Sequence, residues 1–372
     1  MSLLFQPLAI GALALANRIV IAPMCQYSAV DGSATDWHLI HLGHLALSGA
    51  ALLVLEATAV EAEGRITPGC LGLYSDANEA ALAHVLDGVR AHSAMPLAIQ
   101  LAHAGRKASS RAPWLGGAQM PLGAAGSWRA VSASAFVHIK GEGPPLALDH
   151  AGLARVREAF AQAARRAARL GLQGIELHAA HGYLLHQFLS PLANQRRDEY
   201  GGSLANRLRF PLEVFSAVRA AFPSERPVWA RVSATDWVDG SGWDIEGAIA
   251  FARGLKERGC AAIRVSSGGV SPHQKIALAP GYQVHLAAQI KATVGLPTIA
   301  VSLITEPAQA EAIIAAGQED AVALARAMLY DPRWSWHAAA QLGAQVSAPP
   351  QYWRSQPREF KDLFAGLKFG AR

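Results

Sequence analysis

Residues 150–178 read HAGLARVREAFAQAARRAARLGLQGIELH and show the unit from which the fold can be predicted. The first part is rich in Ala, Leu and Arg and has helical character. It follows Asp149, a favourable N-cap, and it ends at Gly171, a residue type that often follows the C-terminus of a helix. A short apolar run then begins at Gly174 and ends at His178. The stretch therefore predicts a helix that leads into a β-strand.

The same alternation of short apolar runs and longer helical segments extends along the whole chain. Apolar strands that alternate with helices indicate a parallel sheet covered by helices. Eight such units fit a closed (β/α)8 TIM barrel, of class α/β, better than an open doubly wound sheet. An open sheet that binds a dinucleotide would carry G-x-G-x-x-G after its first strand, where this chain has APMCQYS. The expected strands are residues 18–22, 52–57, 96–101, 174–178, 228–232, 262–265, 298–301 and 321–325.

Residues 102–148 form a long excursion after the third strand. They are rich in Gly, Pro, Ser and Trp, and they far exceed the roughly 2 to 6 residues that usually join a barrel strand to its helix. Because these loops lie at the catalytic face of a barrel, we expect a lid that lines the substrate site. A separate small domain is the alternative. We expect a C-terminal arm at 345–372 and a single barrel domain over 1–372.

The composition excludes several classes of protein. The formal net charge is +5, but Lys and Arg are scattered, which argues against a nucleic-acid partner. Cys25, Cys70 and Cys260 are too few and too far apart for a disulfide framework or a four-Cys metal site. No segment reaches the roughly 18 apolar residues that a membrane helix needs. We therefore expect a cytoplasmic protein that binds neither membrane nor nucleic acid.

Polar side chains stand at the C-terminal ends of nearly all the expected strands, where a barrel gathers its functional residues. The loops after strands seven and eight commonly hold a phosphate, so we expect Arg326 to bind one through charge-assisted hydrogen bonds. Together these residues describe a pocket for a planar, phosphorylated cofactor and a carbonyl substrate. The group after the strands comprises Pro23, Met24, Cys25, Gln26, Tyr27, Gln100, His103, His178, His181, Tyr183, Arg231, Ser302 and Arg326.

Several of these residues also have a purely structural interpretation. A lone Cys at a strand end is more often a small buried residue than a reactive one. Arg231 could balance an inward carboxylate. His103, His178 and His181 could be core histidines, or the ligands of a metal-dependent barrel hydrolase. We expect no bound metal, because no Asp or Glu stands at a strand end beside them; Glu56 and Glu176 fall within strands.

Three blocks of the chain resemble signature blocks of the old yellow enzyme family. The middle block is long and specific, and the resemblance covers nearly the whole chain. The pairing of Cys25 with Tyr27 resembles the bacterial xenobiotic reductase-like subclass rather than the yeast type. The blocks are NRIVIAPMCQYS at 17–28, HAAHGYLLHQFLSPLANQRRDEYGGSLANRLRF at 178–210 and LARAMLYDPRW at 324–334.

This resemblance implies an FMN-dependent oxidoreductase, an NADPH dehydrogenase that reduces the C=C bond of activated alkenes such as α,β-unsaturated carbonyl compounds. It implies tightly bound, non-covalent FMN, with NADPH or NADH as reductant. His178 and His181 would hold the carbonyl oxygen of the substrate, and Tyr183 would donate the proton. The family usually has Gly at the positions of Ser302 and Ala325. The FMN contacts carried over by position are Pro23, Met24, Cys25, Ala57, Gln100, Arg231, Ser302, Ala325 and Arg326.

In the related subclass, a C-terminal tail reaches the site of a neighbouring subunit. The comparable stretch here is SAPPQYWRSQP at 347–357. We therefore expect Trp353 and Arg354 to line a partner's substrate pocket in a homodimer or a dimer of dimers. Tyr27 is also expected to bind the substrate. A tail packed on its own barrel is the alternative.

Three other functions share features with this interpretation. A dienoyl-CoA-type reductase shares the barrel, but it would need an iron–sulfur Cys cluster and further domains. A metal-dependent barrel hydrolase would be colourless and contain metal. A non-catalytic flavin-binding sensor would be yellow but inert toward enones. A visible spectrum and an assay of nicotinamide oxidation with cyclohexenone would separate these functions.

Overall fold

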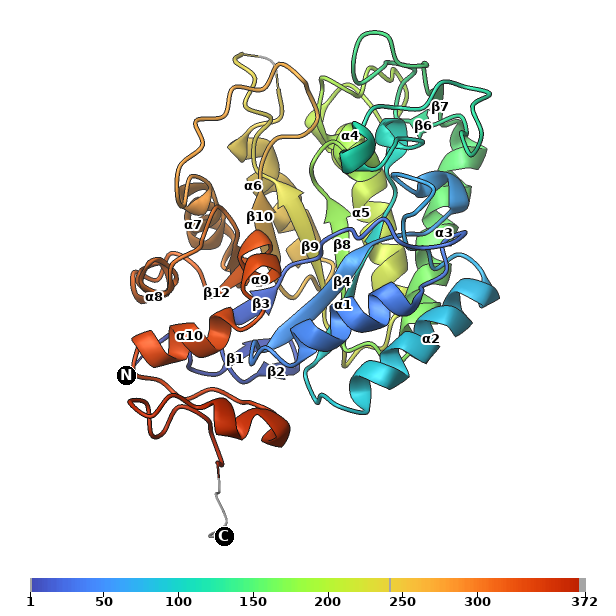
Figure 1. The fold of residues 1–372 in the computed structure, drawn as a ribbon. Coiled ribbons are helices and arrows are strands. Elements are labelled where there is room, and N and C mark those ends of the chain that lie inside the picture. The colour runs from blue at the N-terminus through green and yellow to red at the C-terminus, as the bar shows by residue number, and fades with distance from the viewer. Residues whose placement is uncertain (1, 241, 368–372) are drawn as a thin grey trace.

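Eight parallel strands close into a barrel in the computed structural model, which describes residues 2–240 and 242–367 (Figure 1). Val322 and Leu324 of the last strand pair with Ile19 and Ile21 of the first, which closes the sheet. The predicted TIM barrel is confirmed, and each strand lies within two residues of its expected bounds. In order around the barrel the strands are β3 (Ile19–Ile21), β4 (Leu52–Ala59), β5 (Leu97–Ala102), β8 (Gly174–Ala179), β9 (Val228–Ser233), β10 (Ile263–Ser266), β11 (Thr298–Ala300) and β12 (Ala321–Leu324).

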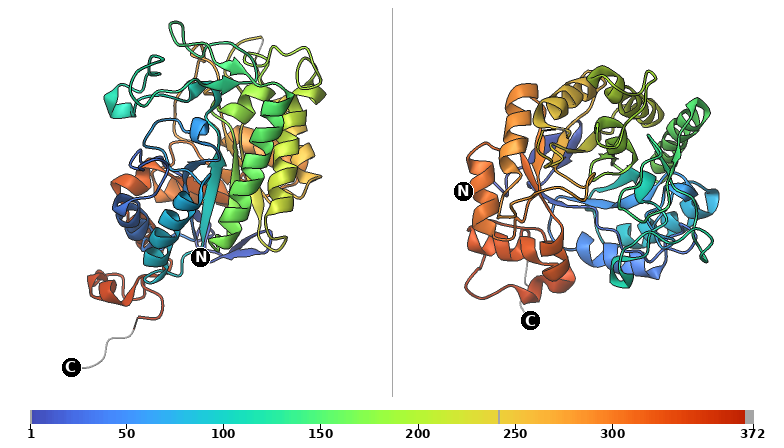
Figure 2. Two further views of the ribbon diagram at one scale, coloured as in Figure 1. Left: turned by 90° about the vertical axis from the view of Figure 1, so that its right-hand side faces the viewer. Right: turned by 90° about the horizontal axis from the view of Figure 1, so that it is seen from above.

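Helices surround the barrel, as the view from above shows (Figure 2). The helix predicted from residues 150–171 is α3, and Asp149 Oδ1 accepts a hydrogen bond from Gly152 N at 2.7 Å. Ser203 caps α5 in the same way. The helices are α1 (Asp36–Ala46), α2 (Asp76–Arg90), α3 (His150–Arg169), α4 (Leu184–Leu189), α5 (Leu204–Ala221), α6 (Ile245–Lys256), α7 (Val284–Val294), α8 (Pro307–Ala315), α9 (Arg326–Tyr330) and α10 (Trp334–Gln341).

The excursion between β5 and α3 lies above the C-terminal ends of the strands, beside α4 (Figure 1). Its base is anchored by Ala104, Ala108 and Ala130, which form a small buried cluster. Its outer part leaves Trp114 and Leu115 exposed. Short elements punctuate it: the 3-10 turns η2 (Gly105–Lys107) and η3 (Pro113–Leu115), and the two-residue strands β6 (Val131–Ser132) and β7 (Leu146–Ala147), which pair in parallel.

The opposite end of the barrel carries the N-terminal hairpin of β1 (Leu8–Ile10) and β2 (Leu13–Leu15), and the C-terminal arm (Figure 1). The arm contains the 3-10 helix η4 (Pro350–Ser355), and its apolar residues pack with Trp336 of α10 rather than with the barrel core. Residues 368–372 of the predicted arm lie outside the described residues.

One further 3-10 turn, η1 (Ala62–Gly64), follows β4. None of the helices described here is long and apolar enough to cross a membrane.

Candidate functional site

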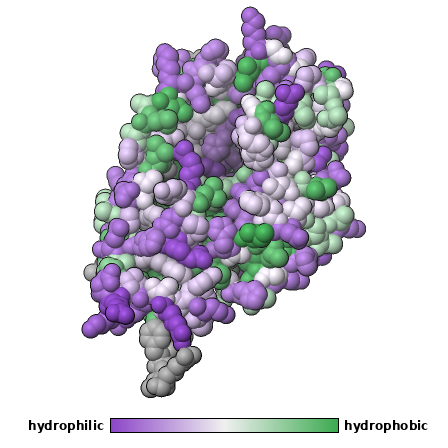
Figure 3. All heavy atoms as spheres, viewed as in Figure 1, coloured by the Kyte–Doolittle hydropathy of each residue, from purple (hydrophilic) through white to green (hydrophobic). Residues whose placement is uncertain are grey.

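A cavity of about 360 Å³ opens at the C-terminal ends of β3, β9, β10, β11 and β12. The space-filling view shows the molecule hollowed near this end, with hydrophilic residues around the hollow (Figure 3). The barrel thus brings together side chains from positions 22 to 327 of the chain. Of the FMN contacts predicted from the sequence, those that line the cavity are Pro23, Arg231, Ser302, Ala325 and Arg326.

The end of the cavity formed by the loops after β11 and β12 suits a phosphate. Arg326 is exposed at the start of α9 and has no carboxylate within ion-pair distance among the residues described. Ser302 has φ 138°, a backbone conformation that favours glycine. Two hydrogen bonds hold it there, because Ser302 Oγ accepts from Gln283 N and Ser302 O accepts from Gly281 N, each at 2.8 Å. Ser at a position where the family usually has Gly is therefore accommodated by local bonding.

Beneath the cavity, the barrel interior holds a polar network centred on Glu176. This buried carboxylate accepts hydrogen bonds from Gln100 Nε2, Arg264 Nη2 and Trp229 Nε1, the last at 2.8 Å. Arg264 lies beside Arg231 in the register of β10 and β9. Burial and the charge of Arg264 lower the pKa of Arg231 to about 9, so Arg231 is still a cation at neutral pH.

Arg231 could bind an anionic or polar group of a ligand in the cavity. Its Nε is buried and makes no hydrogen bond within the described part of the chain, and its guanidinium lines the cavity. A buried cation without a partner is unfavourable unless a ligand supplies one. The heterocyclic ring of a flavin, with its carbonyl oxygens and the negative charge it carries when reduced, is such a ligand.

The two imidazoles and the phenol gather at the end of β8. The ring centroids of His178 and His181 are 5.1 Å apart, and those of His178 and Tyr183 are 4.9 Å apart. His178 Nδ1 accepts a hydrogen bond from Ala180 N at 3.2 Å, which leaves the proton on Nε2. Nε2 of His178 lies 3.4 Å from Nδ1 of His181, and Nε2 of His181 lies 2.6 Å from Ser266 Oγ.

The environment fixes the protonation states of these side chains. Burial, followed by the charge of Arg231, holds the pKa of both His178 and His181 well below the usual range, so both are neutral. Burial also raises the pKa of Tyr183 well above 10. The site therefore offers neutral N–H donors and a protonated phenol at physiological pH.

The backbone of this loop is held by contacts from three directions. His181 and Gly182 have φ 57° and φ 72°. His181 N donates to Ser233 Oγ at 3.0 Å, and Gly182 N donates to His186 Nδ1 at 2.9 Å. Lys107 Nζ donates to His181 O at 2.9 Å and to Gly269 O at 3.1 Å. The loops after β5, β8 and β10 are thus joined around His181.

The remaining predicted flavin contacts flank the cavity. Ala57 and Gln100 are buried register partners on β4 and β5. Met24 packs against the core, and Cys25 is half-buried. Burial, followed by the neighbouring Cys70, raises the pKa of the Cys25 thiol well above its usual value. Cys25 is therefore a neutral thiol, suited to contact with a ring and poorly suited to nucleophilic attack.

Some predicted residues lie elsewhere. Tyr27 lines a second cavity of about 540 Å³ under the excursion. Trp353 and Arg354 belong to η4 at the opposite end of the barrel, where Trp353 Nε1 donates to Ala348 O at 3.0 Å. The structure therefore does not bring these two residues to the cavity of their own chain.

His103 does not join the other two histidines as a group of metal ligands. It is buried, with its Nε2 3.3 Å from Glu61 and its Nδ1 accepting from Gly105 N at 3.0 Å. Across the described residues, the one group of three potential ligands with atoms within 4.8 Å of one another lies at the surface. That group is His150, Asp198 and Glu199.

Sequence reasoning missed the contribution of β10. Ser266 ends this strand and Ser267 follows it, and both line the cavity. Tyr282 and Gln283 reach the cavity from the following loop. The two serines come directly after the apolar run at 262–265. The criterion used for the other strands, a polar residue at the C-terminal end, would have selected them. Lys107 carries no such signal, because it lies inside the excursion.

Three comparisons with known proteins bear on this site. The model of the NADH:flavin oxidoreductase / NADH oxidase family matches residues 3–345. The NADPH dehydrogenase of Bacillus subtilis (strain 168) is 40% identical over 353 residues, which cover 94% of this chain and 98% of the relative. Morphinone reductase has a similar structure, with a TM-score of 0.75 and 29% identity, over 99% of this chain and 94% of that one.

A 2-naphthoyl-CoA reductase, solved with 2-naphthoyl-CoA, is also similar, with a TM-score of 0.81 and 25% identity. The match covers 92% of this chain and 52% of the reductase, so the chain spans about half the length of that protein.

Proposed function

Because this chain belongs to the NADH:flavin oxidoreductase / NADH oxidase family, and within it to the old yellow enzymes, we propose that it reduces the C=C bond of α,β-unsaturated carbonyl compounds. It is an oxidoreductase that uses FMN, with NAD(P)H as reductant. The observation that carries the proposal is the cluster of His178, His181 and Tyr183 beside the cavity of Arg231. We further propose that the enzyme acts in the cytoplasm, where its reductant is present.

The residues around the cavity fit FMN. Arg326, with the backbone at Ser302 and Ala325, would hold the phosphate, and Arg231 would face the polar edge of the ring. When bound, FMN supplies hydride transfer, taking a hydride from NAD(P)H and delivering it to the β-carbon of the alkene. The protein supplies binding, orientation and electrostatic stabilisation.

His178 and His181 would bind the carbonyl oxygen of the alkene. This oxygen gains negative charge as the β-carbon is reduced, and an N–H donor aimed at it stabilises the transition state. His178 carries its proton on Nε2, and the substrate oxygen would replace Ser266 as the partner of His181 Nε2. Removal of one such donor typically costs roughly 2.7 to 4 kcal/mol of transition-state stabilisation.

Tyr183 would complete the reduction by protonating the α-carbon. Its raised pKa keeps the phenol protonated at neutral pH, while the enolate-like carbon that forms in the reaction is basic enough to take the proton. The edge-on contact with His178 fixes the ring near the carbonyl site.

The test uses the purified holoenzyme with NADPH and cyclohexenone. For Tyr183→Phe we expect turnover to fall by roughly 10²- to 10⁴-fold, the usual contribution of a general acid. Anaerobic bleaching of the flavin by NADPH should keep its rate, because that half-reaction needs no proton from Tyr183. Tyr330→Phe, at a tyrosine 94% exposed on α9, is the matched control and should leave both steps unchanged.

Two results would contradict the proposal. Yellow protein that is bleached by NADPH but leaves enones unreduced would indicate a flavoprotein without ene-reductase activity. Unchanged enone turnover in Tyr183→Phe would remove Tyr183 as proton donor.

A further inference from the structure

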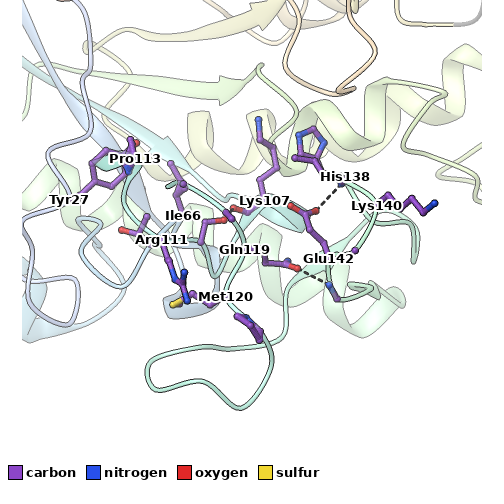
Figure 4. Close-up of a pocket in the computed structure, with 18 residues that line it drawn as sticks. Tyr27, Ile66, Lys107, Arg111, Pro113, Gln119, Met120, His138, Lys140 and Glu142 are labelled. Atoms are coloured by element: carbon purple, nitrogen blue, oxygen red, sulfur yellow. Dashed lines mark hydrogen bonds between the residues drawn. The ribbon is translucent and has the colours of Figure 1, made fainter. Parts of the chain in front are cut away.

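The second cavity, of about 540 Å³, has no role in the alkene reduction proposed above (Figure 4). Most of its wall comes from the excursion between β5 and α3. Tyr27, Ile66 and Thr67 form the rest of the lining. A cavity of this size can hold a large part of a small ligand.

The charge of this cavity is strongly one-sided. Lys107, Arg111 and Lys140 line it, and Glu142 is the one acidic residue of its lining. Glu142 Oε2 already accepts a hydrogen bond from Ile139 N at 2.9 Å. Among the residues described, no carboxylate lies within ion-pair distance of any of the three cations. An anionic ligand could therefore pair with them without displacing a protein carboxylate.

Lys107 is the most informative of the three cations. Its ammonium group bonds only to backbone carbonyls in the described structure, those of His181 and Gly269. Burial, followed by the charge of Arg106, lowers the pKa of Lys107 to about 8, so the amine is mostly charged at neutral pH. A half-buried cation without an anion is costly, and an anionic ligand would offset that cost.

Burial and the charges of Lys107 and Arg106 lower the pKa of the neighbouring His138 to about 4, so this ring is neutral. Its Nδ1 is buried and makes no hydrogen bond within the described residues. Figure 4 shows His138, Lys107 and Glu142 at one side of the cavity, with Arg111 further along the wall. The lining thus combines free positive charge with an unpaired polar atom.

The cavity adjoins the reaction site. Lys107 Nζ lies 5.2 Å from the ring centroid of Tyr183 and bonds to the backbone of His181, which lines the flavin cavity. Tyr27 lies only four residues beyond Pro23, another flavin-cavity residue. A molecule that reaches the flavin could therefore extend a second, anionic part into this cavity.

We propose that this cavity binds the phosphate groups of NAD(P)H while the nicotinamide ring stands at the flavin. Two groups of the reductant carry phosphate: the pyrophosphate bridge, which NADH and NADPH share, and the 2′-phosphate, which NADPH alone has. Cationic side chains that lack a carboxylate partner suit either group. The inference rests on the use of NAD(P)H as reductant and does not require that an alkene be the oxidant.

The test measures anaerobic reduction of the flavin in the holoenzyme by stopped flow, with three reductants. NADPH, NADH and 1-benzyl-1,4-dihydronicotinamide share the hydride-donating ring, and the last has no phosphate. For Arg111→Gln and Lys140→Gln we expect the half-saturating concentration of NADPH to rise about 2- to 5-fold each, as for loss of one exposed charge-assisted contact. The double variant should show a larger rise.

The phosphate-free reductant is expected to reduce these variants as it reduces the unmodified enzyme. Arg165→Gln is the matched control: this arginine lies on α3 outside the cavity, where it pairs with Glu158. It should leave all three reductants unaffected. Added inorganic pyrophosphate should compete with NADPH in the unmodified enzyme and compete less in the double variant.

The three reductants separate the outcomes. A rise with NADPH but not NADH would assign the cavity to the 2′-phosphate, and an equal rise with both would assign it to the pyrophosphate. Unchanged saturation by both dinucleotides, or the same change with the phosphate-free donor, would overturn the inference. No enone is present, so failure here is distinct from failure of the proposed alkene reduction.

Discussion

Glu176 neutralises the positive charge inside the barrel. Arg264 and Arg231 are neighbours across β9 and β10, and Glu176 is bonded to the first of them. The same carboxylate accepts from Gln100 Nε2, which fixes the amide of a predicted flavin contact. Glu176 would therefore influence the flavin although it is not expected to touch it.

Replacement of Glu176 by Gln tests this influence. The variant keeps one acceptor oxygen, which can still bond to Gln100, but it removes the negative charge that compensates Arg264 beside Arg231. Added positive charge stabilises a reduced, anionic flavin, so we expect the midpoint potential to rise, on the order of 30 mV for about 1.4 kcal/mol in a two-electron couple. Spectroelectrochemical titration measures the potential. Glu79→Gln, which removes a surface carboxylate paired with Arg166 and Arg169, should not change it; equal potentials in all three proteins would contradict the role of Glu176.

Glu319 makes stability depend on pH. It is buried just before β12, and neither carboxylate oxygen has a hydrogen-bond partner in the described structure. Burial raises its pKa to about 8 from an ordinary value of 4.5. The folded state therefore keeps a proton that the unfolded state releases. The contribution of Glu319 to stability is most favourable below pH 4.5 and is lost as pH rises toward 8.

Glu319→Gln removes this titration. We expect the variant to be more stable than the unmodified protein at pH 8, with a gain that grows by at most about 1.4 kcal/mol per pH unit between the two pKa values. Denaturant unfolding at pH 5, 6.5 and 8 measures the difference. A difference in unfolding free energy that is constant over this range would show that Glu319 does not titrate as argued.

At the scale of elements, the reaction site depends on the contact between the loops after β8 and β10. Gly182 has φ 72°, and a Cβ added there would lie 2.1 Å from Gly269 O. The two loops approach so closely because Gly has no side chain at this point. Lys107, from the excursion, bonds to both loops and ties a third element to them.

Gly182→Ala should separate these loops, and Gly202→Ala provides a matched control. Gly202 has φ 76°, but an added Cβ would meet nothing within 4 Å, so its replacement reports backbone strain alone. We expect Gly202→Ala to cost about 1 kcal/mol of unfolding free energy, and Gly182→Ala to cost roughly 1 to 3 kcal/mol more from overpacking. Urea unfolding measures both. If both variants lost the same unfolding free energy, the two loops would accommodate the added methyl group at Gly182 without an energetic cost.

At the scale of the whole molecule, the two ends of the barrel carry different features. The two cavities described above and the excursion lie at the C-terminal ends of the strands, and the C-terminal arm lies at the other end (Figure 1). We propose that Trp353 and Arg354 line the substrate pocket of a neighbouring subunit in a homodimer or a dimer of dimers. The position of η4, away from the cavity of its own chain, supports this proposal.

Mixed oligomers test the shared site. Co-expression of Arg354→Ala with Tyr183→Phe would create, in each mixed pair, one pocket with both residues intact. We expect activity toward cyclohexenone above that of either variant alone. If the tail served its own subunit, no mixed pair would hold an intact pocket and activity would not rise. Fully active monomers in sedimentation would also refute the shared site.

Much of the barrel was predictable because its signals are local. The apolar runs, Asp149 as a helix cap and the segment that contains His178, His181 and Tyr183 are each legible within a few residues. The parallel order of the strands then places their polar C-terminal residues at one mouth. Pro23, Arg231, Ser302, Ala325 and Arg326 meet at one cavity for this reason.

What the sequence by itself determined is therefore the set of elements, their order and the end of the barrel at which the polar residues collect. Only the tertiary structure decided that His181 meets Ser266, that Glu176 holds Arg264, and that cations of the excursion line a second cavity. The physical reason is range. The sequence signals of strands and helices lie among neighbours in the chain, whereas His181 and Ser266 are 85 residues apart and Glu176 and Arg264 are 88 apart, so only tertiary packing sets these distances.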